Sequence, residues 1–461
     1  MRKFKLPIQQ EITEEIIIDL IEKHNTEHSR IIKMKKYYNN ENEIIDRKYT
    51  DPNKPKNKLS HGYSSLITNS FVGYFLGEPV TYKSDNENLL NKLNEAFVYN
   101  DEADENTTLA QEASICGYAY EIMYTDQDSQ LRFKQVPTEE VIVVYDNTLE
   151  ENIQFAIRYY DVYSLDNEDT KEVVLYTKDS IKTYDLKQDK LTLKEEVSHY
   201  FDDVPIVDFE NNKERTGDFE KVISLINAYD KANSDTANDF EYFTDALLVI
   251  SGILIDEKDE EGRPLNFKDN RVLNFADSQA KAEYLIKNIN DTALENYKNR
   301  LNQDILRFAS VVDMTDKNFA SNLSGVAIKY KLMAMEHLTG IKESKFKKGL
   351  MRRIELACKI LSIKTNSLIT YTEIKPVFTR NIPANENELV STVKQLYGIV
   401  SEETLLSLLP FIENVKDELE AIEKENEDKA ITGYENLGEE FNQPLEDNTE
   451  GVEDEQEEWY R

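Results

Sequence analysis

The chain has 461 residues and a formal net charge of −34, which disfavours nonspecific binding of nucleic acid but permits a local basic site. No apolar run reaches the roughly 18 residues of a membrane-spanning helix, and the first ten residues lack the apolar core of a signal peptide, so we expect no membrane partner. From its length we expect about two to four domains. Its two cysteines, Cys116 and Cys358, provide neither a disulfide framework nor a metal-binding spacing, so we expect a reducing environment and no cofactor.

Helical patterns open the chain and strands follow them. Residues 10–38 place apolar side chains on one side of a predicted helix. Ser60 can cap a second helix that stops at Gly77, and residues 104–115 predict a third. Short alternating runs, separated by Asp and Asn turns, fill residues 119–197 and predict an antiparallel meander.

Two long helices with a small insertion between them are predicted next. Apolar residues recur every three or four positions from Phe219 to Leu247 and predict a helix of about 33 residues, roughly 50 Å long. Strands at 248–255 and 282–287 would close the insertion, and Asp291 can cap the second helix. We therefore expect two roughly antiparallel helices that carry a compact module at their far end, followed by a polar loop.

A long basic helix, from Ser324 to Lys364, follows the polar loop. At about 100° per residue its apolar side chains fall on one stripe and its basic side chains on an adjacent stripe. The ordinary interpretation is a core helix with a solvated basic face, and the alternative is contact with a polyanion, because the rest of the chain is acidic. The apolar stripe comprises Ile328, Leu332, Met335, Phe346, Leu350, Ile354, Ala357 and Leu361. The basic stripe comprises Lys331, Lys342, Lys345, Lys348, Arg352, Arg353 and Lys359.

The C-terminal part holds shorter elements and an acidic tail. Residues 368–378 predict a strand, and helices are predicted at 385–397 and 402–424. Residues 425–461 are acidic and lack a core pattern, so we expect them to be disordered.

Five sequence phrases, in this order, resemble the portal (head–tail connector) proteins of tailed bacteriophages. The branch they resemble is found in long-tailed phages of Gram-positive hosts, and the resemblance covers residues 60–424. The phrases are KLSHGYSSLITNSFVGYFLGEPV, ASICGYAYE, VPIVDFENNKERTGDFEKVISLINAYDKANSD, NDFEYFTDALLVISG and SGVAIKYKLMAMEHL.

Together with the predicted elements, this resemblance implies an α+β portal fold and a division of the chain. The implied fold has a wing, a two-helix stem, a small α/β clip, a long wing helix with a tunnel loop, and a helical crown. The predicted boundaries are an N-terminal helical segment at 1–58, the wing at 59–215, stem helices at 216–250 and 291–312, the clip at 251–290, the tunnel loop at 313–325, the long wing helix and strand at 326–380, the crown at 381–424 and the acidic tail at 425–461.

The resemblance also implies a function without enzymatic activity. Such subunits form a ring, usually of twelve, at one capsid vertex, through which double-stranded DNA is packaged and later ejected. The implied partners are the large terminase subunit, a head-completion or adaptor protein, and the major capsid and scaffolding proteins. We expect assembly in the cytoplasm of a bacterial host and a final location in the virion. The chain lacks a G-x-x-x-x-G-K-[ST] motif, so the energy for DNA movement would come from the terminase.

Three groups of residues are candidates for these contacts. For the loop residues the alternative to DNA contact is an ordinary solvated turn. For the clip residues the alternative to partner binding is a hairpin tip made polar for solubility. For the basic stripe we favour salt bridges between subunits over contacts with DNA. The candidates at the DNA channel are Asp313, Lys317, Asn318, Ser321, Asn322, Ser324 and Lys331. The candidates for partner binding in the clip are Asp259, Glu260, Glu261, Arg263 and Lys268. The candidates for subunit contacts are Lys342, Lys345, Lys348, Arg352 and Arg353.

Two functions from other classes remain as alternatives. His24, Glu27 and His28 have the H-x-x-E-H spacing of an inverted zinc-protease motif, which would suit a metal-dependent hydrolase. No second part of such a site is evident, and exposed helix histidines are the better interpretation. The other alternative is a monomeric acidic scaffold that assembles through its tail and its basic helix. Cys116 lies in an apolar context, where we expect it to pack rather than react.

Overall fold

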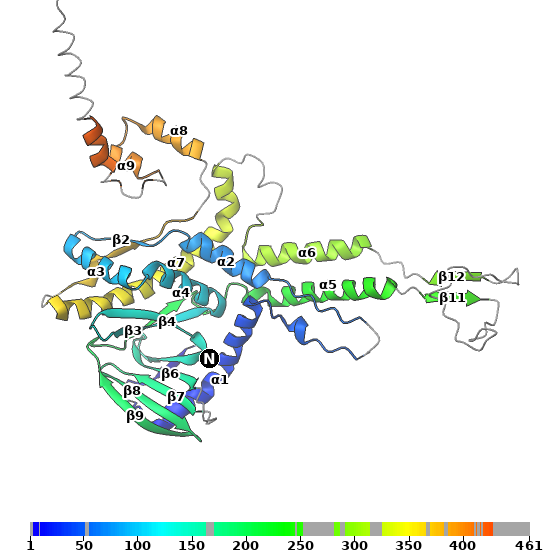
Figure 1. Ribbon diagram of the computed structural model, residues 1–461, viewed down its shortest axis with the longest axis horizontal. Coiled ribbons are helices and arrows are strands. Elements are labelled where there is room, and N and C mark those ends of the chain that lie inside the picture. The colour runs from blue at the N-terminus through cyan, green and yellow to red at the C-terminus, as the bar shows by residue number, and fades with distance from the viewer. Residues whose placement is uncertain are drawn as a thin grey trace, which may run out of the picture. The chain divides into compact units, whose positions relative to one another are not determined.

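The protein is of the α+β class and forms two compact units in a computed structural model (Figure 1). The larger unit comprises Met1–Leu323 and Ala327–Ile382, and the smaller comprises Ser324–Val326 and Pro383–Arg461. None of the helices that the structure describes is both long enough and apolar enough to cross a lipid bilayer. The described residues are 3–8, 10–50, 55–162, 170–244, 247–251, 281–285, 291–313, 325–365, 369–381, 386–409, 412, 415 and 418–426.

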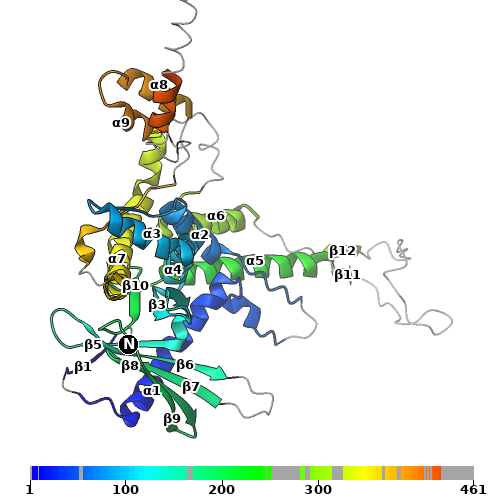
Figure 2. The ribbon, with the colours of Figure 1, turned by 60° about the vertical axis from the view of Figure 1, so that its left-hand side comes forward.

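A six-stranded sheet and the helix α1 (Glu14–Tyr38) form one layer pair of the larger unit (Figure 2). Strands β5 to β9 are the antiparallel meander that the alternating runs predict, and β1 joins its edge in parallel to β5. Ile17 and Leu20 of α1 pack on Ile142 and Phe155 of this sheet. The strands are β1 (Phe4–Leu6), β5 (Val141–Asp146), β6 (Ile153–Val162), β7 (Thr170–Tyr176), β8 (Ser180–Lys187) and β9 (Lys190–Ser198).

The first two strands of the predicted meander belong to a different sheet. Strands β3 (Tyr118–Thr125) and β4 (Leu131–Val136) form a three-stranded sheet in the order β10-β3-β4. Strand β10 (Ile206–Glu210) was not predicted, and it pairs antiparallel with β3. In a continuous meander, the strands beside β3 would be its neighbours in sequence. In this structure β10, which lies far from β3 in sequence, occupies one of these positions. Two further short strands, β2 (Thr81–Lys83) and β13 (Lys375–Val377), pair with each other.

Helices α2, α3 and α4 pack around the small sheets. The predicted Ser60 cap of α2 (Tyr63–Leu76) is wrong, because Gly62 occupies the cap position and the Ser60 hydroxyl donates to the Asn40 carbonyl at 2.8 Å. The end of α2 at Gly77 is confirmed. Helix α4 covers Glu102–Cys116, close to the prediction, while α3 (Glu87–Tyr99) was missed.

Helices α5 (Ile223–Thr244) and α6 (Asp291–Ala309) lie side by side, as predicted (Figure 1). Helix α5 has 22 residues, fewer than expected, because a 3-10 turn at Glu220–Val222 precedes it and β11 (Leu247–Ser251) already begins soon after it ends. Strand β12 (Lys281–Leu285) pairs antiparallel with β11. The rest of the predicted insertion lies outside the described residues.

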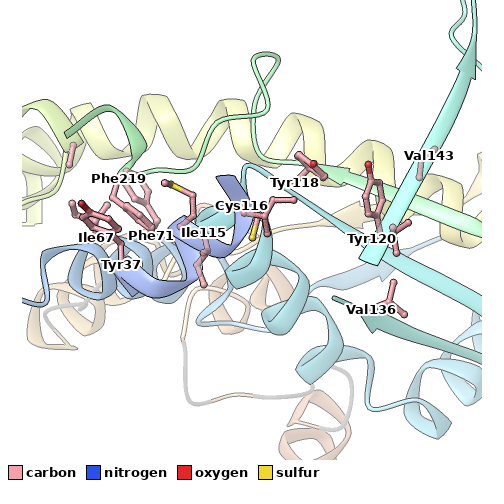
Figure 3. Close-up of a cluster of buried hydrophobic side chains, with 14 of the residues drawn as sticks. Tyr37, Ile67, Phe71, Ile115, Cys116, Tyr118, Tyr120, Val136, Val143 and Phe219 are labelled. Carbon is pink, nitrogen blue, oxygen red and sulfur yellow. The ribbon is translucent and has the colours of Figure 1, made fainter. Parts of the chain in front are cut away.

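The predicted long helix is confirmed as α7 (Gly325–Thr365), which has 41 residues. Its apolar stripe enters two hydrophobic cores. Leu332 and Met335 belong to a cluster with Phe71 and Phe219, part of which Figure 3 shows. Phe346 and Leu350 belong to a second cluster around α3, α4 and β4. Helix α7 therefore connects two of the three hydrophobic cores described in the larger unit.

The C-terminal elements are shorter than predicted. A 3-10 turn at Tyr371–Glu373 precedes β13, so the strand occupies only part of the expected segment. Helix α8 (Glu386–Leu396) matches its prediction, whereas α9 ends at Leu406 after starting at Glu402. A further helical run occupies residues 418–426, so the disorder that we expected for 425–461 is wrong for 425 and 426. Residues 427–461 lie outside the described residues.

Gly349 allows α7 to approach β10 closely, which gives a test of this packing. A β-carbon at Gly349 would lie 2.5 Å from Cδ1 of the buried Phe209, whereas one at Gly340 on the same helix would meet nothing within 4 Å. We expect Gly349→Ala to destabilise the protein by about 1–3 kcal/mol through overpacking. The control Gly340→Ala should stabilise it by up to about 1 kcal/mol, because alanine favours the helix. Denaturant unfolding measures both, and equal effects would contradict the close approach.

Candidate functional site

The candidate site is the junction from which the predicted tunnel loop departs. Asp313 and Lys331 flank this loop, and both are half-buried. The other channel candidates, Lys317, Asn318, Ser321, Asn322 and Ser324, lie outside the described residues. The same holds for the clip candidates Asp259, Glu260, Glu261, Arg263 and Lys268. The junction is therefore built from the residues on either side of the loop.

Both sides of the loop are anchored in one hydrophobic core. On the α6 side, Ile305 and Val311 are buried, and on the α7 side Leu332 and Met335 are buried in the same cluster. The same cluster contains residues from α1, α2, α4, the sheets and the segment that leads into α5, including Ile67 and Phe219 (Figure 3). Close packing of this kind resists displacement, so Val311, just before the loop, and Leu332, which follows it on α7, are held in this core.

The C-terminus of α6 sets the direction in which the chain leaves the core. Ser310 adopts a left-handed conformation with a φ of 59°. The Val311 amide donates to the Leu306 carbonyl at 3.0 Å and the Ser310 amide donates to the Arg307 carbonyl at 3.1 Å. These bonds and the buried Val311 side chain form a Schellman-type end of the helix, a motif in which glycine is the usual left-handed residue.

Side chains of three helices meet beside this turn. The Tyr63 hydroxyl of α2 donates to Asn302 Oδ1 of α6 at 2.6 Å. The Tyr63 ring packs edge-to-face on Tyr229 of α5, with ring centroids 5.1 Å apart. Burial raises the pKa of Tyr63, and the charges of Asp230 and Asp313 act in the same direction. The Tyr63 phenol is therefore neutral at physiological pH and acts here as a hydrogen-bond donor.

Two of the five subunit-contact candidates are buried within one chain, which corrects the prediction for them. Lys342 pairs with Asp218, and Arg353 is fully buried. Lys345 pairs with Glu210 at 2.8 Å, and Arg352 pairs with Asp203 at 3.0 Å. These four residues thus find carboxylate partners in the same subunit, on β3, α4 and the segment around β10.

Lys345 and Arg352 are only half-buried, so a further contact with a neighbouring subunit stays a prediction for them. Lys348 is exposed. All three line a cavity of about 230 Å³, together with Asp203 and Glu210. Burial would raise the pKa of Glu210, but hydrogen bonds from Lys3 and Lys345 and the charge of Arg215 lower it to about 2. The carboxylate therefore stays ionised in this cavity.

Arg353 forms the most enclosed ion-pair network on α7. Its Nε and Nη2 atoms donate to the two Glu121 oxygens at 2.9 and 2.7 Å. Its Nη1 atom donates to Asn106 at 2.7 Å and to Glu102 at 3.2 Å. Burial alone would lower the pKa of Arg353, but the charge of Glu121 raises it, and burial likewise raises the pKa of Glu121 against the charge of Arg353. The pair is buried at the cost of desolvation and is held by mutual attraction and hydrogen bonds.

Sequence reasoning missed Arg215 as a structural residue. Arg215 Nη1 contacts Asp208 at 2.6 Å, and its guanidinium lies 3.8 Å from the centroid of the Tyr118 ring. Gly117 has a φ of 93°, and a β-carbon there would lie 2.1 Å from the Arg215 carbonyl oxygen, so only glycine fits this approach. Arg215 belongs to the polar run ENNKERTGD, where a solvated charge is the usual expectation. The run itself contained no signal of burial.

The H-x-x-E-H pattern does not form an exposed pair of histidines. His24 is buried, and its Nδ1 atom lies 2.8 Å from the Tyr159 hydroxyl. Burial lowers the pKa of His24 to about 4. Glu27 accepts hydrogen bonds from Arg30 at 2.7 Å and from Tyr118 at 2.9 Å, and His28 is half-buried. The expectation of exposed histidines is therefore wrong for His24, whose ring packs in the core.

Metal-binding chemistry finds no support in the part of the chain that the structure describes. No group of three or more His, Cys, Asp or Glu side chains there is arranged to hold a metal ion. Cys116 and Cys358 are both buried, and burial raises the pKa of both thiols, that of Cys358 to about 12. Both cysteines pack as small apolar residues, as we expected for Cys116.

Comparisons with known proteins point to one family. Residues 18–431 match the sequence model of the family described as phage portal protein, SPP1 Gp6-like. The portal protein of Bacillus phage SPP1 is 26% identical over 443 residues, which cover 89% of this chain and 86% of that protein. The portal protein of Clostridium phage phiCD119 is 24% identical over 420 residues, which cover 84% of this chain and 90% of that protein.

Solved structures with some likeness are chains from the necks of GTA particles. A chain from the neck of the empty GTA particle matches with a TM-score of 0.42 and 12% identity, covering 76% of this chain and 90% of that one. A chain from the neck of the native GTA particle matches with a TM-score of 0.43, 10% identity and the same coverage. The family assignment depends on the sequence matches alone.

Replacing Arg353 separates its role within the chain from a role between subunits. Arg353→Met leaves Glu121 buried without a counter-charge and should destabilise the single chain by about 3–5 kcal/mol in denaturant unfolding. The double variant Arg353→Met with Glu121→Leu should recover part of this loss, because Glu121 no longer leaves a buried charge and Glu102 still accepts hydrogen bonds from Tyr82 and Asn106. Lys348→Ala, at an exposed position, serves as the control. Unchanged stability of the single chain in Arg353→Met would contradict the buried network.

Proposed function

This chain belongs to the SPP1 Gp6-like family of phage portal proteins, which connect the phage head to the tail, and we propose that twelve copies close into a ring around a channel for double-stranded DNA. The family is structural rather than enzymatic, and its members are components of the virion. In our proposal the ring occupies one capsid vertex after assembly in the host cytoplasm. It admits DNA that the terminase drives and later releases it.

The order of the elements carries this proposal. Two neighbouring helices, α5 and α6, bear a β pair at the ends where they are joined, and they would form the stem and the base of the clip. Helix α6 then returns to a hydrophobic core, from which the loop at 313–325 departs before α7 begins. This arrangement supports a tunnel loop that is positioned by the core of each subunit. The clip would bind the large terminase subunit and, after packaging, a head-completion or adaptor protein.

Exposed aromatic residues on the helix pair support lateral contacts between copies. Phe240 of α5 is 55% exposed, and Tyr297 and Phe308 of α6 are 51% and 64% exposed. Tyr297 and Phe308 are eleven residues apart in sequence, so they share one face of α6. A narrow helix pair with large apolar side chains on its surface gains stability when a neighbour covers them. Capsid and scaffolding proteins are the proposed partners at the outer surface of the ring.

The channel function requires that the protein bind DNA weakly enough for the duplex to move. Each phosphate neutralised by a lysine or arginine strengthens binding regardless of sequence, so a channel rich in such contacts would slow the duplex. The strongly acidic composition of the chain fits a channel in which DNA slides. Lys317 and Lys331 are our proposed contacts to the phosphate backbone, with Asn318 and Asn322 beside them. Such contacts position the duplex and carry no information about its sequence.

Native mass measurement tests the ring. We expect the purified chain to form a closed assembly of about twelve copies by mass photometry, because the stem helices need lateral neighbours. Phe308→Glu should shift the distribution toward single chains. Leu149→Glu, at a fully exposed turn of the wing sheet, should leave the assembly unchanged. A wild-type protein that is monomeric at all concentrations, with no effect of Phe308→Glu, would favour the acidic scaffold.

Substitution of two lysines tests the channel. Lys317→Ala combined with Lys331→Ala should change the rate or extent of DNA packaging in a terminase-driven assay, while rings still form. Lys190→Ala, at the exposed start of β9, should leave packaging unchanged. Loss of rings in the double variant would instead assign these lysines to subunit contacts.

A further inference from the structure

The first half of α7 has a second, mostly apolar stripe on the side that faces away from the buried Leu332 and Met335. Tyr330 is 73% exposed, Met333 51% and Ile341 52%. A helix that is apolar on both sides is normally buried on both. The part of the chain that the structure describes leaves this second stripe exposed, on a stretch of α7 that extends beyond α2 (Figure 2). Its members, which we call the outer stripe, are Tyr330, Met333, Ala334, His337, Leu338 and Ile341.

The outer side of α7 changes character after Ile341. Arg352 and Lys359, further along the same side, pair with Asp203 of the same subunit. The apolar outer side is therefore a local feature of about eleven residues, roughly 16 Å long, and the rest of this side is an ordinary charged surface. The positions that continue the outer side are Ser344, Lys348, Arg352, Glu355 and Lys359.

The charges at the two ends of the outer stripe are positive. Lys329 lies at its start and Lys347 lies beyond its end, and both are exposed. The two carboxylates of this stretch, Glu336 and Glu343, both pair with Arg380, at 2.9 and 2.6 Å. The outer stripe therefore presents an apolar centre between two cationic ends.

This combination of groups selects one kind of partner. Proteins contact the phosphate backbone of DNA mainly with charged and polar groups, so the apolar centre does not fit DNA. A protein surface with apolar side chains at its centre and acidic side chains at its rim fits both the centre and the ends. The chain itself is rich in acidic side chains, with 89 Asp and Glu against 55 Lys and Arg. A second copy of this chain is therefore the partner whose charge fits.

The outer stripe does not suit a contact with the same stripe of a second copy. In an antiparallel twofold contact, Lys329 of one copy would face Lys347 of the other at both ends. Like charges that face each other across an interface cost binding free energy, and the outer stripe has no acidic side chain to offset them. The covering surface is thus a different one. A contact between two different surfaces repeats from head to tail, and it closes into a ring when the rotation allows.

We propose that the outer stripe of α7 binds a different, acidic surface of the next copy in the ring. The inference rests on the proposed function, because it assigns residues to a contact that the ring requires. It accounts for the two apolar sides of this half of α7. The buried stripe packs in the core of its own subunit, and the outer stripe packs on the neighbour. The helix that follows the proposed tunnel loop is then held between two subunits.

Two isoleucines of α7 provide a matched test of this contact. Ile341→Glu places a charge in the outer stripe, and Ile363→Glu places the same charge at a 61% exposed position near the end of the helix. By mass photometry, Ile341→Glu should lower the fraction of chains in closed assemblies by about tenfold or more, because the contact would bury an unpaired carboxylate. Ile363→Glu should assemble as the wild type does. Denaturant unfolding checks that both variants are folded, and Tyr330→Glu replaces Ile341→Glu if it is not.

A photo-crosslinking side chain at position 333 identifies the surface that covers the outer stripe. Met333 is replaced by p-benzoylphenylalanine, and rings are assembled from isotope-labelled and unlabelled chains, so that mass spectrometry separates links between copies from links within one copy. We expect links from position 333 to peptides of a second copy that lie outside residues 325–348. The acidic side chains near the linked peptides then identify the groups that face Lys329 and Lys347.

The possible failures of this inference and of the proposed function differ. Rings that form equally well with Ile341→Glu would overturn the inference and leave the proposed function in place. Links confined to residues 325–348 of a second copy would exclude the head-to-tail contact, and a lack of links between copies in intact rings would exclude a second copy as the partner. A wild-type chain that stays monomeric at every concentration would contradict the proposed function and this contact together.

Discussion

A helix of 41 residues needs partners along most of its length, and the burial of α7 is the constraint around which the larger unit is organised. Its apolar stripe enters two cores, and its basic stripe meets carboxylates on β10, α4 and β3. Arg353 joins the helix to Glu121 and Glu102, and Lys345 joins it to Glu210. The acidic composition of the chain thus has a structural role, because some of its acidic side chains pair with the basic side chains of α7 in the same subunit.

The sequence predicted those parts of the fold whose signal is periodic and local. The three- and four-residue spacing located α7 within a residue or two, and alternation located the strands of the meander. Strands β1 and β10 were missed, because a short strand that pairs with a distant segment has no local period. The buried partners of Arg353 were also missed, since Glu121 is 232 positions away and a charged stripe looks the same whether water or a carboxylate faces it.

The role of the loop at 313–325 stays a prediction from the resemblance. The structure describes the residues on its two sides, with Ile305 on α6 and Met335 on α7 in one core. Nothing in the spacing of the polar link between α1 and α2 indicated that it would bind α5, because Asn42 and His61 contact Asp230 only after two helices have packed. This link looked like a simple connection in the sequence, and in the fold it is hydrogen-bonded along α5.

The left-handed turn at Ser310 sets the direction in which the chain enters the proposed tunnel loop, independently of the residues in that loop. Backbone hydrogen bonds at the end of α6 and the buried Val311 determine where the chain points when it leaves the core. The length and chemistry of the loop can therefore change in evolution without changes in the residues at the end of α6 that hold it. A phage lineage with a different packaging motor or a differently modified genome could therefore change through substitutions in the loop. The core of the subunit would remain the same.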